Sequence, residues 1–343
     1  MKLFRNLVYC LAVVVPAAAL AACSAAGNAP VAQPPEQSSI TVEAVPTSDE
    51  AGLYVAYDEG LFREQGLNVN IVPTNGGDLT LGDLKSGKAQ IVAGNYVSFV
   101  QFQASHEANL RIVANGSLMQ PGNQALYVMP NSRYHSVADL AKHHAVIGVN
   151  TTNNVGQLLI GSLLKSQGDS LSDVTLYAPK NAFTEEMSML KSGRLSAAWL
   201  PQPFGTMAQQ QFGAVQLADL DQGALRNFPI GCYIGTSTWV RDHPNTVAAF
   251  LRALKEGQQV ADTNRSAVEQ ALEKHTGVPP LIADTMTVNN YPLYMDVPQM
   301  QRVADAMYEF HVMPSGYSYA KPYDLSSMVQ SEPGMVSMGP GNG

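Results

Sequence analysis

Residues 40–61 read ITVEAVPTSDEAGLYVAYDEGL, and this stretch predicts a strand, a turn and a helix in that order. The β-branched residues at its start favour a strand, and the apolar run from residue 51 onward favours a helix. Thr47 and Ser48 stand between the two, where a hydroxyl can cap the helix. Asp49 and Glu50 would follow in its first turn, where acidic side chains complement the helix dipole. The stretch therefore predicts the first half of an α/β unit.

A second copy of this plan occurs further along the chain. Residues 145–164 read AVIGVNTTNNVGQLLIGSLL, in which Thr151 and Thr152 stand 104 residues after Thr47 and Ser48. The tetrapeptide LKSG also recurs, at residues 84–87 and 190–193. LKSG alone could be a common helix ending with a glycine cap. Two repeats with offsets of 104 and 106 residues, in the same order along the chain, predict two lobes built on one plan.

The N-terminus has the features of a secretory signal. Lys2 and Arg5 precede an apolar stretch over residues 7–20, which is too short to span a bilayer comfortably. The sequence LAAC at residues 20–23 resembles a bacterial lipobox. We expect residues 1–22 to be removed as a signal peptide and Cys23 to be acylated, which anchors a protein without a transmembrane helix. In the alternative, the signal is an ordinary secretory one and Cys23 is incidental.

The composition indicates an exported globular protein with tails. Residues 23–39 are rich in Ala, Gly, Pro, Gln and Ser, so we expect a flexible lipidated tether. The last stretch, residues 326–343, has no periodicity, and we expect it to be disordered. Between them lie enough residues, at 45% hydrophobic content, for two cores. A formal net charge of −8 argues against a nucleic-acid partner.

The cysteines and histidines indicate neither a metal site nor a redox pair. Of the three cysteines, Cys10 lies in the signal and Cys23 at the lipobox, which leaves Cys232 alone. His143 and His144 are adjacent, so on a helix they would not share a face as metal ligands do. Sequence motifs of serine hydrolases, zinc proteases, P-loops and dinucleotide-binding loops are missing. We therefore expect no catalytic residues, no metal and no cofactor.

Alternating strands and helices predict mostly parallel sheets covered by helices. Ligands of such sheets bind at the loops that leave the carboxyl ends of the strands. In both repeats these loops and the helices they open are rich in hydroxyl, amide and aromatic side chains, which can bind a small polar solute. The candidate substrate-binding residues are Thr47, Ser48, Tyr54, Asn75, Gly76, Asn95, Tyr96, Thr151, Thr152, Asn153, Trp199 and Gln202.

Each of these residues also has a purely structural interpretation. The hydroxyls of Thr47 and Thr151 could serve only as helix caps. Tyr54 lies on an apolar helix, and Trp199 ends a short apolar strand, so both rings could fill a core instead of lining a cleft. Asn75 with the glycines after it could be a turn that needs glycine.

The order of motifs resembles a known family. The segments GLYVAYDEGLFREQGLNVNI, LKSGKAQIVAGN, VADLAKHHAVIGV and AAWLPQPF are similar to solute-binding proteins of ABC importers for nitrate, alkanesulfonates, taurine and thiamine-pyrimidine precursors. The match runs from about residue 40 to about residue 263. The resemblance implies a type II periplasmic-binding fold with two α/β lobes and a ligand cleft between them. Lobe 1 would comprise residues 40–126 and 231–325, lobe 2 residues 127–230, and the crossings would lie near residues 124–128 and 231–235.

The chain departs from the family where the ligand would lie. Many relatives carry Glu-Pro where this chain has Gln202-Pro203, so a carboxylate that could receive a ligand amine is missing there. An anion would depend on backbone amides at helix starts, and Asp49 and Glu50 beside one of them would oppose it. A neutral or weakly basic heterocycle could instead stack on aromatic rings. The sequence leaves the ligand open between a heterocycle, an organic sulfonate and nitrate.

Taken with the resemblance, the sequence predicts a monomeric, lipid-anchored, non-enzymatic solute receptor on the extracytoplasmic face of a bacterial membrane. It would close on a small polar solute and present it to an ABC permease with a cytoplasmic ATPase. A pyrimidine-precursor-forming enzyme of the same fold is an alternative, although this chain has no cysteine cluster of the kind that enzyme needs. A sensory ligand-binding lipoprotein and a purely structural lipoprotein are further alternatives.

Overall fold

The computed structural model describes residues 33–74 and 77–329, and within them the side chains of residues 77–79 are left out. Contacts group Pro34–Gly343 into one compact unit. The predicted signal peptide, Cys23 and most of the predicted tether lie outside the described residues, as do Asn75, Gly76 and most of the predicted tail. No helix within the described ranges is long and apolar enough to cross a membrane.

The first sheet has the strand order β2-β1-β3-β10-β4. Strand β1 (Ser39–Ala44) pairs in parallel with β2 (Asn68–Pro73) and with β3 (Ile91–Asn95). Strand β10 (Pro229–Thr236) lies antiparallel between β3 and β4 (Leu110–Leu118). A strand from late in the chain thus completes a sheet begun at its start, and we call this sheet with its helices the first lobe.

The second sheet repeats the arrangement, with the order β7-β6-β8-β5-β9. Strand β6 (Val146–Gly148) pairs in parallel with β7 (Thr175–Tyr177) and β8 (Ala197–Pro201). Strand β5 (Gln124–Val128) lies antiparallel between β8 and β9 (Val215–Asp219). Each lobe therefore holds three parallel strands beside an antiparallel strand that enters from the other part of the chain. The two matching sheets agree with the shared plan that the repeats predict.

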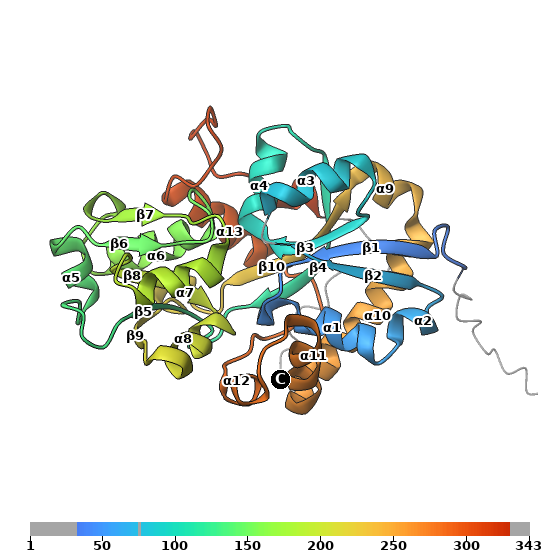
Figure 1. Cartoon of the computed structure of the whole chain (residues 1–343). Helices are drawn as coiled ribbons and strands as arrows, with labels where there is room; N and C mark the ends of the chain where they lie inside the picture. Colours follow the sequence, from blue (N-terminus) through green and yellow to red (C-terminus); the bar gives the residue numbers. More distant parts are fainter. Residues whose placement is uncertain (1–32, 75–76, 330–343) are drawn as a thin grey trace, which may run out of the picture. The chain divides into compact units, whose positions relative to one another are not determined.

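Each sheet carries its own helices (Figure 1). In the first lobe, α3 and α4 lie on one face of the sheet, and α1, α2 and α10 on the other. The elements of the first lobe are η1 (Ser48–Glu50), α1 (Ala51–Asp58), α2 (Leu61–Glu64), α3 (Gly77–Ser86), α4 (Tyr96–Ala104), α9 (Ser237–Asp242) and α10 (Pro244–Thr263). Those of the second lobe are α5 (Val137–Lys142), α6 (Val155–Ser166), η2 (Leu171–Asp173), α7 (Ala182–Lys191), α8 (Phe204–Phe212) and η3 (Gly223–Leu225).

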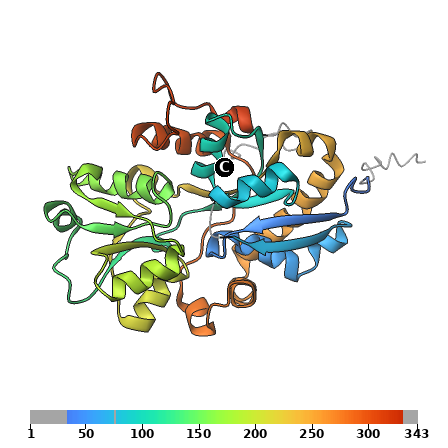
Figure 2. The ribbon, with the colours of Figure 1, turned by 45° about the horizontal axis from the view of Figure 1, so that its top comes forward.

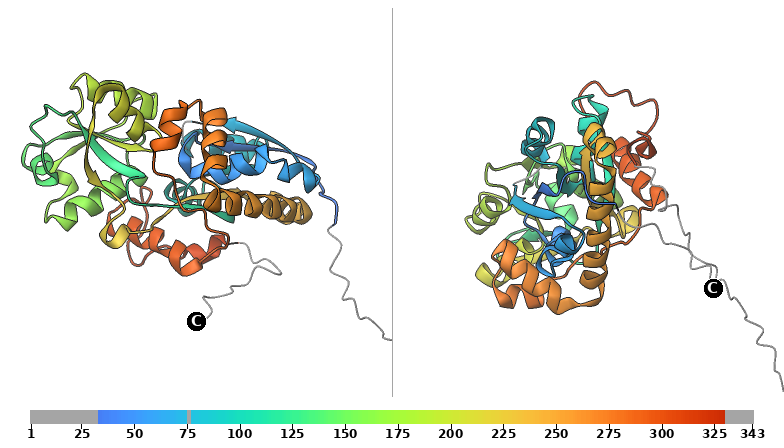
Figure 3. Two further views of the ribbon diagram at one scale, coloured as in Figure 1. Left: turned by 90° about the horizontal axis from the view of Figure 1, so that it is seen from below. Right: turned by 90° about the vertical axis from the view of Figure 1, so that its right-hand side faces the viewer.

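Helix α10 packs along α1 for much of its length, and Figure 3 shows its full extent. The two backbones approach closely because both helices carry glycine at the contact. A Cβ atom on Gly257 would lie 2.5 Å from the Cβ of Ala56 and 2.6 Å from the carbonyl oxygen of Gly52. Glycine at these positions lets α10 lie directly against α1 and cover one face of the first sheet.

The chain after α10 forms α11 (Arg265–Thr276), α12 (Pro280–Thr285), α13 (Val297–Glu309) and η4 (Leu325–Met328). Helix α13 packs on α4 and β10, and Figure 2 shows it beside α4. Residues 326–328, predicted as part of the disordered tail, belong to η4, and Val329 forms a β-bridge with Ile112.

The two crossings between the sheets come a few residues before the expected positions. Strand β4 ends at Leu118 in the first sheet and β5 begins at Gln124 in the second, so residues 119–123 make the first crossing. Residues 220–228 make the return between β9 and β10. Residues 124–128 and 231–235, expected to cross, are instead buried strand segments, because each pairs with a strand on both sides.

Candidate functional site

A small cavity of about 40 Å³ lies between the two lobes, where the carboxyl ends of strands from both sheets meet. Residues in the last part of β3 and β8 and residues just after β1 and β6 contribute to it, which is where a sheet of this kind binds ligands. Its walls are formed by residues of both lobes. The lining residues are Val45, Thr47, Asp49, Glu50, Gly94, Asn95 and Ile230 from the first lobe, and Gln124, Asn150, Val155, Phe183, Trp199 and Pro201 from the second lobe.

The first-lobe wall is built around Asp49 in the short helix η1. The hydroxyl of Thr47 donates to Asp49 Oδ2 at 3.2 Å, and Nδ2 of Asn289 donates to Asp49 Oδ1 at 2.7 Å. Thr47 occupies the N-cap position of η1, but its side chain makes no capping hydrogen bond. Its hydroxyl therefore orients the Asp49 carboxylate at the edge of the cavity.

Two carboxyl groups of this wall have raised pKa values. Burial raises the pKa of Asp49 to about 6, and the hydrogen bonds from Asn289 and Thr47 only partly oppose that shift. Burial raises the pKa of Glu50 well above its usual range, the nearby Asp49 carboxylate adds to the shift, and a hydrogen bond with Tyr233 opposes it. None of the residues that line the cavity is Lys, Arg or His. The cavity is therefore acidic.

Aromatic rings form the second-lobe wall. The indole of Trp199 donates through Nε1 to Gln124 Oε1 at 3.0 Å, and the ring of Phe183 meets it edge-on at 5.6 Å between centroids. Gly156 lets α6 approach this indole, because a Cβ there would lie 2.5 Å from Trp199 Cε3. The hydrogen bond and the edge-on packing fix the orientation of the indole in the wall.

The lobes touch beside the cavity through hydrogen bonds. The backbone N–H of Ser48 donates to the carbonyl oxygen of Gln202 at 3.1 Å, and Nδ2 of Asn154 donates to Ser98 Oγ at 2.9 Å in a buried contact. Gln101 Nε2 also donates to the carbonyl oxygen of Asn153, at 2.7 Å. These contacts connect the start of η1 and helix α4 to the second lobe.

The structure brings Thr47, Asn95 and Trp199 to the cavity and places the other candidates around or away from it. Asn95 also caps α4 by accepting from the N–H of Ser98 at 2.9 Å. Ser48 and Gln202 lie at the contact between the lobes. The side chain of Gln202 donates to Gly122 O at 3.2 Å and accepts from Thr206 N at 3.2 Å. These bonds hold the turn that contains the cis peptide bond between Gln202 and Pro203.

Tyr54 and Tyr96 belong to the cores of the first lobe rather than to the cavity wall. Tyr54 stacks on the ring of His275 with centroids 4.7 Å apart, and its hydroxyl donates to Val45 O at 3.3 Å. The hydroxyl of Tyr96 donates to Asn115 Oδ1 at 2.9 Å in a buried contact. The helical apolar pattern around both residues is the signal for this placement.

Thr151, Thr152 and Asn153 are not among the residues that line the cavity. Asn150, directly before them, does line it, and helix α6 begins after Asn154, whose Oδ1 accepts from the N–H of Val155. In the turn between β6 and α6, Asn150 thus lines the cavity and Asn154 bonds to Ser98 of the other lobe. Asn150, Phe183 and Gln124 were missed as site residues; Asn150 had a signal, because it is the first polar residue after the strand.

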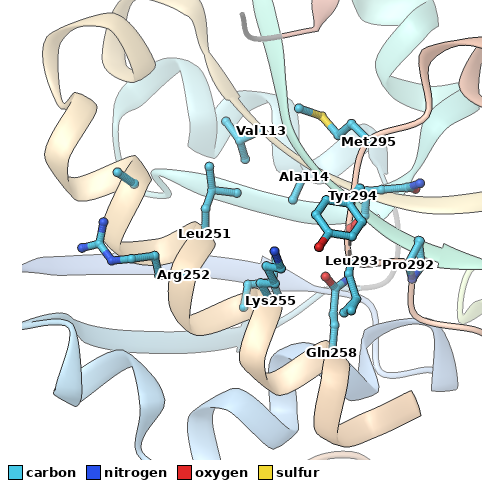
Figure 4. Close-up of a pocket in the computed structure, with 13 residues that line it drawn as sticks. Val113, Ala114, Leu251, Arg252, Lys255, Gln258, Pro292, Leu293, Tyr294 and Met295 are labelled. Carbon is cyan, nitrogen blue, oxygen red and sulfur yellow. Dashed lines mark hydrogen bonds between the residues drawn. The ribbon is translucent and has the colours of Figure 1, made fainter. Parts of the chain in front are cut away.

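A larger cavity of about 320 Å³ lies on the first lobe, between α10 and residues 292–295 (Figure 4). Its wall includes Leu251, Met295 and Lys255, and the ammonium group of Lys255 lies 4.2 Å from the centroid of the Tyr294 ring. It is lined by first-lobe strand β4, helix α10 and the segment after α12, so no second-sheet residue contributes to it. Among the described residues, no group of three or more His, Cys, Asp and Glu side chains could hold a metal ion.

The profile of the family described as NMT1/THI5 like matches residues 47–265. No curated protein sequence matches the chain.

Three solved structures illustrate the similarity of fold. The alkanesulfonate-binding protein SsuA from Xanthomonas axonopodis pv. citri bound to MOPS has a TM-score of 0.71 at 16% identity, over 86% of this chain and 99% of its own. The periplasmic nitrate-binding protein NrtA from Synechocystis PCC 6803 has a TM-score of 0.69 at 14% identity, over 84% and 85%. The desulfurization enzyme DSZB has a TM-score of 0.62 at 16% identity, over 85% and 99%. These similarities confirm the predicted two-lobed periplasmic-binding fold.

Proposed function

The chain belongs to the NMT1/THI5-like family, and from this premise we propose that it is the lipid-anchored, extracytoplasmic substrate-binding protein of an ABC importer. It binds a small polar solute between its lobes. The candidate classes are an organic sulfonate, a nitrate- or taurine-type anion and a thiamine-pyrimidine-type compound. The observation that carries the proposal is the cavity lined from both lobes, at the carboxyl ends of strands in two matching sheets.

In this proposal, ligand binding shifts the equilibrium from separated lobes toward joined lobes. A solute that touches Thr47 on one wall and Trp199 on the other has its full set of contacts only when the lobes meet, so it stabilises that state. The bonds from Ser48 to Gln202 and from Asn154 to Ser98 form in the same arrangement. The closed form is then the one that an ABC permease with its cytoplasmic ATPase recognises, and the protein acts as a monomer held at the membrane by lipid on Cys23.

An enzyme is the second candidate, because DSZB shares the fold. A hydrolytic or redox reaction usually depends on a nucleophile or a proton-transferring group in contact with the substrate. Among the described residues that line the cavity, the carboxyl groups of Asp49 and Glu50 could transfer a proton, but none is cysteine or histidine, and the thiol of Cys232, 1% exposed, is buried in strand β10. The missing thiol and imidazole groups favour a binding protein. Product formation from any bound solute by the purified protein would instead support the enzyme.

Intrinsic fluorescence offers a direct test, because the chain has two tryptophans and only Trp199 lines the cavity. Solutes of the three classes are titrated into a fragment that begins near residue 38, and fluorescence and thermal unfolding are recorded. A ligand at about 100 times its Kd should stabilise the protein by about 2.7 kcal/mol. The fluorescence response should vanish in Trp199→Phe and persist in Trp239→Phe, whose indole stacks on His243 instead.

Failure of every class to change either signal would contradict the proposed function. A response that Trp199→Phe retains and Trp239→Phe loses would place the ligand elsewhere on the protein. A sensory lipoprotein would give the same binding result, and it is distinguished by the neighbouring genes, which would encode a kinase instead of a permease.

A further inference from the structure

The two acidic side chains in the cavity wall are not matched by any basic one. Asp49 and Glu50 both line the cavity, and its other lining residues are neutral. Lys180, in the turn between β7 and α7, is exposed and does not line the cavity. The charge that a ligand meets here is therefore negative, and a bound anion would be repelled at short range.

The uncharged residues of the wall add a hydrogen-bond acceptor and aromatic rings. Asn150 Oδ1 is buried without a hydrogen-bond partner in the protein, so it needs a donor from a ligand or from water. Trp199 and Phe183 supply aromatic rings, on whose faces a cation is attracted to the π-electrons. Acids, a free amide oxygen and aromatic rings all favour a ligand that donates hydrogen bonds and carries positive charge.

The protonation of the two acids supports the same conclusion. Asp49 has a pKa of about 6, so it is mostly ionised at neutral pH, whereas the pKa of Glu50 is raised by burial and by Asp49. A cation between them would stabilise both carboxylates and would lower both pKa values. Binding at neutral pH should therefore release protons.

We propose that the cavity selects a small organic cation, an ammonium or amidinium group on a compact apolar or aromatic body, with Asp49 and Glu50 as its counter-charges and Trp199 and Phe183 as its aromatic walls. This inference rests on the proposed function and narrows its ligand class. It separates this chain from SsuA bound to MOPS and from the nitrate-binding protein, which share its fold at 16% and 14% identity.

The size of the cavity limits what can bind without movement. Its volume of about 40 Å³ corresponds to about three water molecules. An ammonium head group fits in this space, and a larger body needs the lobes to separate at the bond between Ser48 and Gln202. The cationic head then lies against Asp49 and Glu50 while the body faces Trp199.

The test uses probes of matched shape and opposite charge. Benzylammonium is compared with benzenesulfonate, and guanidinium with nitrate, by isothermal titration calorimetry and Trp199 fluorescence. We expect binding of the cations and none of the anions. Asp49→Asn and Glu50→Gln should each lose about tenfold or more in cation affinity, as expected for a lost charge-assisted contact. Calorimetry in buffers of different ionisation enthalpy should show proton release.

Glu43→Gln is the matched control, because Glu43 is also buried in the first lobe but does not line the cavity. It should bind cations as the unaltered protein does. Circular dichroism and thermal unfolding without ligand confirm that each variant is folded.

The outcomes separate the inference from the proposed function. Binding of an anion, with affinity kept or increased in Asp49→Asn, overturns the cation assignment and leaves a solute-binding protein. Cation binding that survives both Asp49→Asn and Glu50→Gln overturns the role given to these acids. No response to any cation, anion or neutral polar solute overturns the inference and the proposed function together.

Discussion

Asp49 is held in a setting that disfavours its charge, and this should appear in the stability of the ligand-free protein. Its pKa is raised from 3.8 to about 6 by burial. The folded state therefore binds the proton more tightly than the unfolded state. Protonated Asp49 therefore stabilises the folded state fully below pH 3.8, its unfolded-state pKa. This stabilisation is lost as the pH rises through about 6, its folded-state pKa. Above pH 6, the ionised side chain lowers the free energy of unfolding.

Asp49→Asn should therefore raise the free energy of unfolding above pH 7 and give no such gain near pH 3.8. The gain is at most about 1.4 kcal/mol for each unit of pKa shift. Urea unfolding of both proteins across this pH range measures it. Asp139→Asn is a control of opposite sign, since hydrogen bonds from His135 and Ser136 lower the pKa of Asp139. A gain for Asp49→Asn that does not depend on pH would contradict the assignment.

Glu186 is a second carboxyl group whose environment opposes ionisation. It is fully buried in the second lobe against Gly148, and neither carboxyl oxygen has a hydrogen-bond partner in the protein. Burial raises its pKa well above the usual range. Glu186→Gln keeps the shape and removes the charge, so it should raise Tm more at alkaline than at acidic pH. Glu185 on the same helix is only half-buried and accepts a hydrogen bond from Asn181 N, so Glu185→Gln should not raise Tm at alkaline pH.

At the residue scale, the sequence located the loops of the site better than the side chains within them. Thr47 was proposed because it follows an apolar strand and Trp199 because it lies in one near its end, and both line the cavity. Thr151 was chosen by its offset from Thr47, yet Asn150 lines the cavity in its place. One position in a loop decides which side chain points into a cleft, and the packing of the loop against the other lobe sets that position. A repeat in sequence does not contain this information.

At the scale of elements, the contact between α1 and α10 depends on glycine. Gly257→Ala would put a methyl group 2.5 Å from Ala56 Cβ, against backbone that cannot easily move. We expect a loss of about 1–3 kcal/mol in the free energy of unfolding. Gly82→Ala, in helix α3 with nothing within 4 Å of the new Cβ, should instead stabilise by about 0.5–1 kcal/mol. Chemical denaturation of the two variants gives both values, and equal effects of one sign would contradict the contact.

The elements themselves were largely predictable, because hydrophobic periodicity and turn residues act locally. The strand after residue 40, the helix from residue 51 and their counterparts in the second lobe all form. The crossings were placed a few residues too late. Residues 124–128 and 231–235 are apolar, and apolar strands can extend within a sheet or connect two sheets. Only their pairing with neighbours on both sides, a long-range property, decides between these outcomes.

At the scale of the whole described unit, the chain after α12 connects the lobes in a way that the sequence did not suggest. Helix α13 packs on α4, and Glu309 near its end forms an ion pair with Lys165 of α6 in the second lobe. Phe310 also approaches Gly161 of that helix. The C-terminal segment therefore touches both lobes, so any separation of the lobes would have to rearrange it or carry it along with one lobe.

The buried bond between Asn154 and Ser98 should bias the equilibrium between separated and joined lobes. Ser98 is 1% exposed and its hydroxyl accepts from Asn154 Nδ2 at 2.9 Å. Ser98→Ala leaves that donor buried without a partner when the lobes meet, whereas water can satisfy it when they separate. The cost, about 1–3 kcal/mol, falls on the joined state alone. The variant should therefore favour separated lobes and bind its solute more weakly, because the apparent Kd equals the intrinsic Kd divided by the fraction of binding-competent protein.

Distances between labels on the two lobes test this directly. Gln65→Cys on the first lobe and Lys142→Cys on the second lobe carry spin labels, and pulsed electron paramagnetic resonance measures the distance between them. Cys232 is buried and should remain unlabelled. Ser98→Ala should shift the distance distribution away from that of the unaltered protein, and saturating solute should restore it. Ser196→Ala, which removes a hydroxyl bonded to Tyr134 within the second lobe, should change neither distance nor affinity. If Ser98→Ala behaves like Ser196→Ala, the contact does not control closure, and the lobes are held by the remaining bonds at Gln202 and Asn153.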